Sequence, residues 1–224
     1  MSTRVGVVVF PGTNCEQDVA WAVEVVGGSV EMLWHADPTL RSVDAVVLPG
    51  GFAHGDYLRT GAIARFSPVM EAVASFAAEG GPVVGICNGF QILTEAGLLP
   101  GALQKNAGLK FRCETVEVRV ETTESALTSQ GVRGQILRIP INHFEGNFVC
   151  DPETLRRIRD LDQVVLRYLK NPNGSLDDIA GICNEGRNVV GLMPHPERAC
   201  EPVLGSADGA VLLRSLLSVA SVAA

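Results

Sequence analysis

Four short apolar runs rich in β-branched residues stand out in the first hundred residues. Runs of this kind are typical of parallel strands that are buried on both faces of a sheet. They cover residues 5–10, 30–34, 45–48 and 83–86. The longer segments between them have apolar positions at helical spacing, and this alternation predicts βαβ units and a parallel sheet.

The helices of this part have start and stop signals. Thr13 and Glu16 form a capping-box pattern ahead of the first helix, which a pair of glycines ends. Residues 63–79 predict a second helix, with Pro68 near the start of its main part. A third helix is expected directly after the fourth strand, as far as about Glu95.

The middle of the chain has a different pattern. Residues 116–120 alternate valine with charged side chains, as in a half-exposed antiparallel strand. The remaining predicted elements are strands at 135–139, 164–169, 179–183 and 189–193 and an amphipathic helix at 210–219. We therefore expect an α/β fold with a mostly parallel central sheet, flanking helices and additional antiparallel strands, in a single domain over residues 1–224.

Charge and composition narrow the class of protein. The chain has 18 basic and 25 acidic side chains, a formal net charge of −7, which argues against a nucleic-acid or anionic-membrane surface. Its six cysteines, at positions 15, 87, 113, 150, 183 and 200, include no Cys-x-x-Cys pair, so no metal site is expected. No charged-then-apolar leader is present, and we expect reduced thiols in the cytoplasm.

One cysteine lies in a pattern that favours catalysis. Gly85-Ile86-Cys87-Asn88-Gly89 follows a predicted strand and opens a predicted helix, which is the context of a nucleophile elbow. Glycine on both sides allows the sharp turn, and the helix N-terminus favours a thiolate at Cys87. The Asn88 N–H and an N–H from Gly50 or Gly51 are the expected oxyanion donors.

A candidate base follows the last predicted strand, in Pro194-His195-Pro196-Glu197-Arg198. Pro196 favours extended geometry at His195, and residues two apart in an extended segment face the same side. Glu197 is therefore expected to orient the imidazole of His195 while its other ring nitrogen meets the thiol of Cys87.

Three further features have two interpretations each. Gln91 lies one turn after Cys87 and either lines the pocket or is an ordinary helix residue. Cys15 is either an incidental thiol at a helix start or a catalytic residue. His54, Asp56, Tyr57 and Arg59 follow a Gly-Gly turn at the carboxyl edge of the sheet, which suits a ligand or partner contact better than a solvated loop.

These residues resemble the class I, triad-type glutamine amidotransferases, which combine a Gly-x-Cys-x-Gly elbow with a late His-x-Glu. Other blocks resemble one branch of that family, the small, separately encoded glutaminase subunits of phosphoribosylformylglycinamidine synthase. The blocks are residues 11–15, 50–59, 61–64, 85–99, 171–175 and 191–198. His143 and Glu145 also match, whereas Phe144 and Lys170 depart from the pattern without touching the triad.

The resemblance implies a flavodoxin-like fold and a reaction shared with partners. Glutamine is hydrolysed to glutamate and ammonia, with Cys87 as nucleophile, His195 as general acid/base and Glu197 as its partner. The ammonia passes to a synthetase subunit, which uses ATP and Mg²⁺ to make formylglycinamidine ribonucleotide in de novo purine biosynthesis, together with a small accessory subunit. No phosphate-binding glycine loop is present, so no cofactor is expected on this chain.

Two other kinds of function stay open at this stage. One is another enzyme with the same elbow, either a peptidase or a glutaminase that feeds a different synthase. The other is a catalytically silent regulatory or scaffold subunit. The intact set of Cys87, His195 and Glu197 favours an enzyme over a scaffold.

Overall fold

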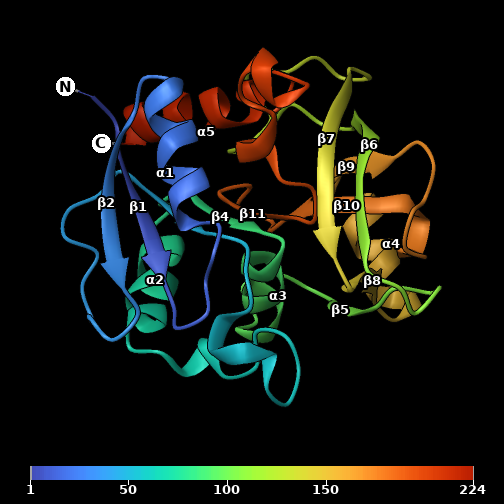
Figure 1. The fold of residues 1–224 in the computed structure, drawn as a ribbon, viewed down its shortest axis with the longest axis horizontal. Coiled ribbons are helices and arrows are strands. Elements are labelled where there is room, and N and C mark those ends of the chain that lie inside the picture. Colours follow the sequence, from blue (N-terminus) through green and yellow to red (C-terminus); the bar gives the residue numbers. More distant parts are fainter. Residues whose placement is uncertain (1, 224) are drawn as a thin grey trace.

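A nine-stranded sheet forms the centre of the computed structural model, which describes residues 2–223 (Figure 1). Its strand order is β2-β1-β3-β4-β11-β10-β9-β6-β7, and β5 pairs with β8 outside it. The strands are β1 (Arg4–Val9), β2 (Ser29–Trp34), β3 (Ala45–Leu48), β4 (Val83–Ile86), β5 (Ala102–Lys105), β6 (Arg112–Val120), β7 (Ile136–His143), β8 (Glu145–Val149), β9 (Val164–Tyr168), β10 (Ile179–Cys183) and β11 (Val189–Leu192).

The sheet has a parallel half and an antiparallel half. β2, β1, β3, β4 and β11 are parallel neighbours, whereas β11, β10, β9, β6 and β7 pair antiparallel. Every residue of β3, β4 and β11 is buried, which explains their continuous apolar sequences. The predicted α/β fold is confirmed.

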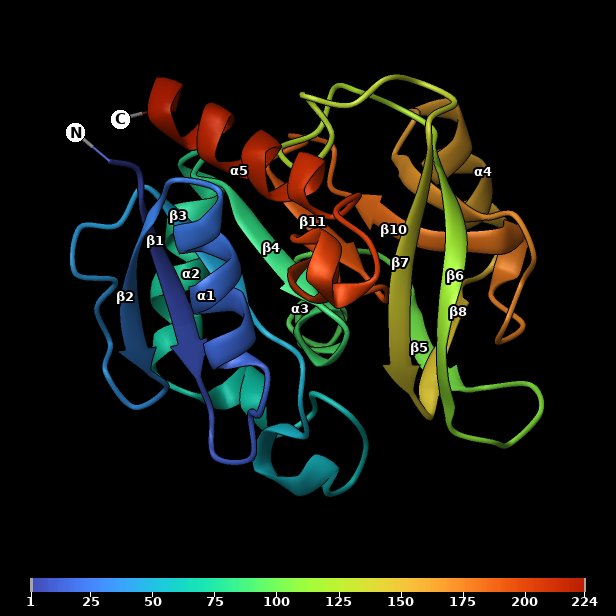
Figure 2. The same cartoon turned by 45° about the horizontal axis from the view of Figure 1, so that its top comes forward.

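Helices cover both faces of the parallel half. Figures 1 and 2 show α1 (Glu16–Val25) and α5 (Ala210–Ala223) on one face, with α2 (Val69–Ala78) and α3 (Asn88–Glu95) on the other. α4 (Pro152–Asp160) lies beside the antiparallel half. In open sheets of this kind, ligands bind at the carboxyl ends of the parallel strands, where the loops after β1, β3, β4 and β11 gather. No helix within residues 2–223 has the length and apolar character needed to cross a membrane.

Two helix predictions were wrong in detail. The predicted capping box does not form, because the hydroxyl of Thr13 accepts the N–H of Phe10, and α1 begins after Cys15 without a side-chain cap. Residues 63–79 are not one helix, because Ser67 is extended ahead of Pro68 and separates a short 3₁₀ turn from α2. The β5–β8 pair and α4 were not predicted, although Asp151 and Pro152 are a start signal for α4.

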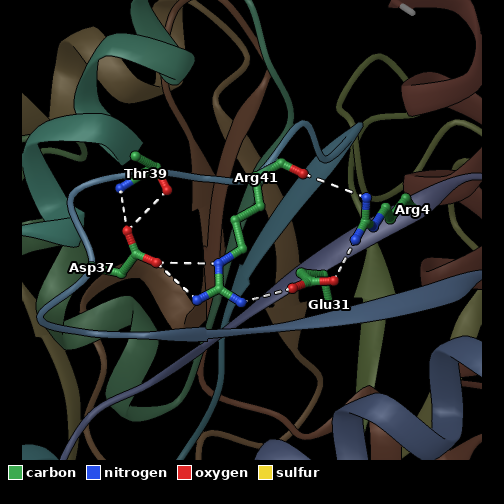
Figure 3. Close-up of polar contacts among 5 residues, drawn as sticks. All are labelled: Arg4, Glu31, Asp37, Thr39 and Arg41. Carbon is green, nitrogen blue, oxygen red and sulfur yellow. Dashed lines mark hydrogen bonds and ion pairs between the residues drawn. The ribbon is translucent and has the colours of Figure 1, made fainter.

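An ion-pair network fixes the free edge of the parallel half (Figure 3). The guanidinium of Arg41 donates to Asp37 at 2.9 and 3.1 Å and to Glu31 at 3.0 Å. Glu31 also accepts from Arg4 on the neighbouring strand, and Asp37 accepts from both the N–H and the hydroxyl of Thr39. The two arginines are exposed and the two acids half-buried, so the network orders the loop after β2 more than it stabilises the fold.

Candidate active site

Cys87 lies in a strained turn between β4 and α3. Its φ of 52° and ψ of −104° are values that side-chain-bearing residues rarely adopt. An ideal Cβ on Gly85 would lie 2.6 Å from the carbonyl group of Gly89. One on Gly89 would lie 1.9 Å from the carbonyl oxygen of Leu48. Glycine is therefore required at both positions, and the predicted elbow geometry is confirmed.

Replacing Gly89 with alanine tests this packing, because helix propensity and sterics predict opposite signs. Propensity alone favours alanine within α3 by about 1 kcal/mol. The contact with Leu48 forces α3 away from β3, and we expect Gly89→Ala to lower the free energy of unfolding by about 3 kcal/mol. Denaturant titration measures the change. Gly108→Ala is the control, since its nearest neighbour is 3.8 Å away, and an equally stable Gly89→Ala variant would contradict the steric argument.

His195 and Glu197 form a buried pair, as predicted. Nδ1 of His195 lies 2.6 Å from Oε1 of Glu197, and the two residues are 1% and 2% exposed. The route to this contact differs from the expectation. Pro196 begins a 3₁₀ helix, η4 (Pro196–Ala199), so Glu197 reaches the imidazole across a tight turn and not along an extended segment.

The environment of His195 favours its charged form. Burial alone would lower the pKa of His195, but the nearby charges of Glu197 and Cys87 raise it well above the ordinary value for histidine. Among residues 2–223, Nε2 of His195 has no hydrogen-bond partner. Since Glu197 fixes Nδ1, Nε2 is the nitrogen left for proton transfer.

Gly50 lies in close contact with three side chains of the site. An ideal Cβ on Gly50 would lie 2.7 Å from Cε1 of His195 and 3.5 Å from Cβ of Cys87. It would also lie 3.1 Å from Sγ of Cys15. The backbone after β3 thus lies between the thiol just before α1 and the elbow thiol, and both thiols are close to one imidazole.

Sequence reasoning left the role of Cys15 open, and the structure places this residue at the site. Its side chain is 2% exposed, and Nη2 of Arg198 donates to its Sγ at 3.1 Å. Arg198 is held in turn by Asp18, at 3.1 Å. The sequence feature that pointed to a role of Cys15 in the site is its position just after the carboxyl end of β1, because functional residues gather at this edge of a parallel sheet.

Cys15, His195 and Glu197 also have ligand types that bind metals. One ligand atom from each lies within 4.8 Å of the others, although the cysteine spacing predicted no such site. The carboxylate and the imidazole already bond to each other, so a metal ion would have to break that contact. The contact between His195 and Glu197 serves proton transfer as it stands.

Cys87 and His195 line one pocket of about 220 Å³. Pockets for drug-sized ligands are usually larger than about 300 Å³, so this one suits a small molecule. Gly51 and Gln91 line it as well, whereas Gly50 packs directly against His195.

The predicted oxyanion donors are well placed but stay a prediction. The Asn88 N–H is the first of α3, where N–H groups have no acceptor within the helix. Gly51, at φ +143°, lies close to the backbone of the loop after β1, where an ideal Cβ on Gly51 would be 2.7 Å from the Asn14 nitrogen. Gly51 lines the pocket and Gly50 does not, which makes Gly51 the better candidate for the second donor.

Gln91 connects the elbow to the opposite wall of the pocket. Its Oε1 accepts from Nδ2 of Asn88 at 2.8 Å, and its Nε2 donates to the carbonyl oxygen of Glu145. A substrate contact of Gln91 remains a prediction, because its amide group already makes these two bonds.

Of the four candidates His54, Asp56, Tyr57 and Arg59, Asp56 alone lines the pocket. His54 packs against the ring of His35, with centroids 5.2 Å apart. Arg59 pairs with Glu95 at 2.6 Å, and Tyr57 is 74% exposed. The expectation of a ligand contact therefore narrows to Asp56.

The loop around residues 142–145 forms the far wall of the pocket. His143 is 3% exposed, and its Nδ1 lies 3.1 Å from Oδ1 of Asn106. Burial, reinforced by the charge of His195, lowers the pKa of His143 to about 4. His143 is therefore neutral near pH 7, in contrast to His195. The bulky Phe144 also lines this wall.

Comparison with known proteins places the chain in a family. Residues 2–209 match the family described as a CobB/CobQ-like glutamine amidotransferase domain. Subunit PurQ of phosphoribosylformylglycinamidine synthase from Rubrobacter xylanophilus is 59% identical over 98% of this chain and 100% of its own length. The corresponding subunit from Koribacter versatilis is 55% identical over 96% of this chain and 97% of its own.

Solved structures agree with this assignment. A chain in the structure of PurLQS from Thermotoga maritima superposes with a TM-score of 0.91 at 43% identity, covering 98% of this chain and 99% of that one. A putative GMP synthase subunit from Thermoplasma acidophilum shares the fold, with a TM-score of 0.70 at 16% identity over 99% and 96% of the two chains. The chain belongs to the glutamine amidotransferase family, in the branch of the PurQ subunits of phosphoribosylformylglycinamidine synthase.

Proposed function

We propose that this chain hydrolyses glutamine to glutamate and ammonia for an ATP-dependent synthetase subunit, which makes formylglycinamidine ribonucleotide in de novo purine biosynthesis. The observation that carries the proposal is one pocket lined by the elbow thiol of Cys87 and by His195, with Glu197 holding the far side of the imidazole. A nucleophile, a base and an orienting carboxylate are the parts that acyl transfer from an amide needs.

The first half of the reaction forms a thioester. The sulfur of Cys87 attacks the side-chain amide carbon of glutamine, and the carbonyl oxygen becomes an oxyanion that the Asn88 and Gly51 N–H groups stabilise. When the C–N bond breaks, Nε2 of His195 donates a proton to the nitrogen, which leaves as ammonia. The raised pKa of His195 suits this step, because the imidazolium is the proton donor.

The second half regenerates the thiol. Neutral His195 takes a proton from water, the water oxygen attacks the thioester carbon, and the C–S bond breaks to give glutamate. Glu197 keeps Nδ1 of the ring protonated throughout, so that Nε2 is the nitrogen that exchanges protons.

The product is used on other chains. In this proposal the ammonia is passed to the synthetase subunit, a small accessory subunit completes the complex, and ATP and Mg²⁺ bind to the synthetase. All six cysteines are free thiols, which suits the reducing cytoplasm as the place of the reaction.

Covalent labelling tests the proposal and separates the two thiols near His195. A chloroketone analogue of glutamine, added to the complex with the synthetase, should attach to Cys87 and be excluded by glutamine. A Cys15→Ala variant should label at Cys87 as the wild type does. Mass spectrometry of proteolytic peptides locates the adduct. Attachment at Cys15, or none in a complex that accepts free ammonia, would contradict the proposed role of Cys87.

A further inference from the structure

Two carboxylates that the reaction scheme does not use line the same pocket as Cys87. They belong to Asp56, in the loop after β3, and to Glu145, at the start of β8. Both residues are half-buried. Oδ1 of Asp56 accepts from Nδ2 of Asn88 at 3.1 Å, and Oε2 of Glu145 accepts from the hydroxyl of Thr60 at 3.2 Å.

Neither carboxylate has a positive partner among residues 2–223. The nearest basic residue along the chain, Arg59, pairs with Glu95 instead. Burial raises the pKa of Asp56 to about 6. The hydrogen bond from Asn88 opposes this shift, and the negative charge of Glu145 adds a smaller increase. A carboxyl group that is partly buried without a counter-charge has a raised pKa, and a second acid in the same site shifts it in the same direction.

The pocket offers a third acceptor. His143 is 3% exposed and lines the pocket, and its Nε2 has no partner among the described residues. The amide of Asn106 settles which nitrogen carries the proton. Its Nδ2 donates to the carbonyl oxygens of Lys110 and His143, at 2.9 and 3.0 Å, so its Oδ1 faces Nδ1 of His143 as an acceptor. Nε2 is therefore an unprotonated acceptor, and the pocket presents three acceptors to a ligand rich in donors.

The two carboxylates are held at a fixed place relative to the reactive thiol. Asn88, which bonds Asp56, is the residue after Cys87, and Gln91 of the same helix donates to the backbone of Glu145. A ligand whose amide meets Cys87 thus meets both acids with its other end. Glutamine is such a ligand, since its other end has an ammonium group with three N–H donors.

We propose that Asp56 and Glu145 bind the α-ammonium group of glutamine and select for an α-amino acid substrate. This inference rests on the proposed glutaminase reaction. It gives the two acids a counter-charge, and it brings an N–H donor into the pocket where Nε2 of His143 has no partner among the described residues. It also orients the substrate, because the two negative side chains repel its α-carboxylate and direct that group to the opposite side of the pocket.

Substrates with and without the amino group test the inference. The assay measures ammonia release by the complex with the synthetase from glutamine and from 4-carbamoylbutanoate, which is glutamine without its α-amino group. Wild-type kcat/KM should be about 100-fold lower for the analogue, because the two carboxylates then have no positive partner in the pocket. Asp56→Asn should lower kcat/KM for glutamine by about 10- to 100-fold, mainly through KM, and leave the analogue nearly unchanged. Glu145→Gln should act in the same direction.

The inference is judged by comparing the kcat/KM values of each variant for glutamine and for the analogue. Equal losses for glutamine and the analogue in Asp56→Asn and Glu145→Gln would overturn the inference, because they would indicate a structural role for the two acids. If the wild-type complex hydrolyses glutamine and the analogue equally well, the inference on the α-ammonium group is overturned and the proposed function is not. Wild-type complex that hydrolyses neither would overturn the proposed function as well. Asp160→Asn, an exposed carboxylate on α4, is the matched control and should leave both substrates unchanged.

Discussion

A Cys87→Ser variant is expected to lose glutamine-dependent synthesis by about 10³-fold or more, while synthesis from free ammonia by the assembled complex stays intact. Serine has nearly the same volume as cysteine, so the elbow, at φ 52°, keeps its geometry. The hydroxyl is a far weaker nucleophile than a thiolate at the N-terminus of α3, and thioester formation fails. Ammonia enters after that step, so the synthetase reaction continues.

The measurement compares product formation with glutamine and with an ammonium salt at the same enzyme concentration. Cys113→Ser is the control, since Cys113 is an exposed thiol on β6, and it should retain both activities. Undiminished use of glutamine by Cys87→Ser would exclude Cys87 as the nucleophile and direct attention to Cys15. Loss of both activities would instead indicate that the variant no longer assembles with the synthetase.

The parts of the site that sequence reasoning found are those encoded within a few neighbouring residues. The sharp turn at Cys87 leaves no room for a side chain at positions 85 and 89, and glycine at both positions indicates this in the sequence. The structure confirms it, because a Cβ at either glycine would overlap the neighbouring backbone. His195 and Glu197 are two positions apart, so their pairing depends on one local turn. The turn proved to be a 3₁₀ helix and not an extended segment, and the contact formed nonetheless.

The remaining parts of the site depend on tertiary structure. The carboxylates of Asp56 and Glu145 share a pocket although 89 positions separate them along the chain, 145 − 56. Cys15 reaches His195 only because β1 and β3 are neighbours in the sheet, so that the loops after both strands meet at one edge. No local pattern of hydrophobic and polar residues encodes these distances.

The errors in secondary structure have local causes that compete with the patterns used. Thr13 has the right spacing to cap α1, but its hydroxyl closes the turn after β1 instead. Pro68 restricts Ser67 to an extended conformation, which interrupts the predicted helix at that point. In the first place a tight turn, and in the second an extended residue before proline, took precedence over helix formation.

A Glu197→Gln variant should reduce kcat/KM for glutamine hydrolysis by about 10²- to 10⁴-fold. The introduced glutamine side chain has the same shape as that of Glu197, and its amide oxygen is still able to accept a hydrogen bond from Nδ1 of His195. The negative charge, however, is lost from a pair that is 1% and 2% exposed. Burial then acts on His195 with less opposition, so its pKa should fall from well above the ordinary value for histidine. Less imidazolium is then available to protonate the departing ammonia.

Two readouts distinguish this electrostatic role from a merely structural one. NMR titration of the His195 ring should show the lowered pKa directly, and the ammonia-dependent reaction of the complex should be unchanged. Glu185→Gln makes the same chemical change at an exposed pair with Arg157 and should alter neither quantity. A Glu197→Gln variant with normal hydrolysis and a lowered His195 pKa would show that the charge of Glu197 is dispensable. A variant with impaired hydrolysis and an unchanged pKa would assign Glu197 to ring orientation alone. The charge of Glu197 is therefore the quantity on which both the protonation of His195 and the release of ammonia are expected to depend.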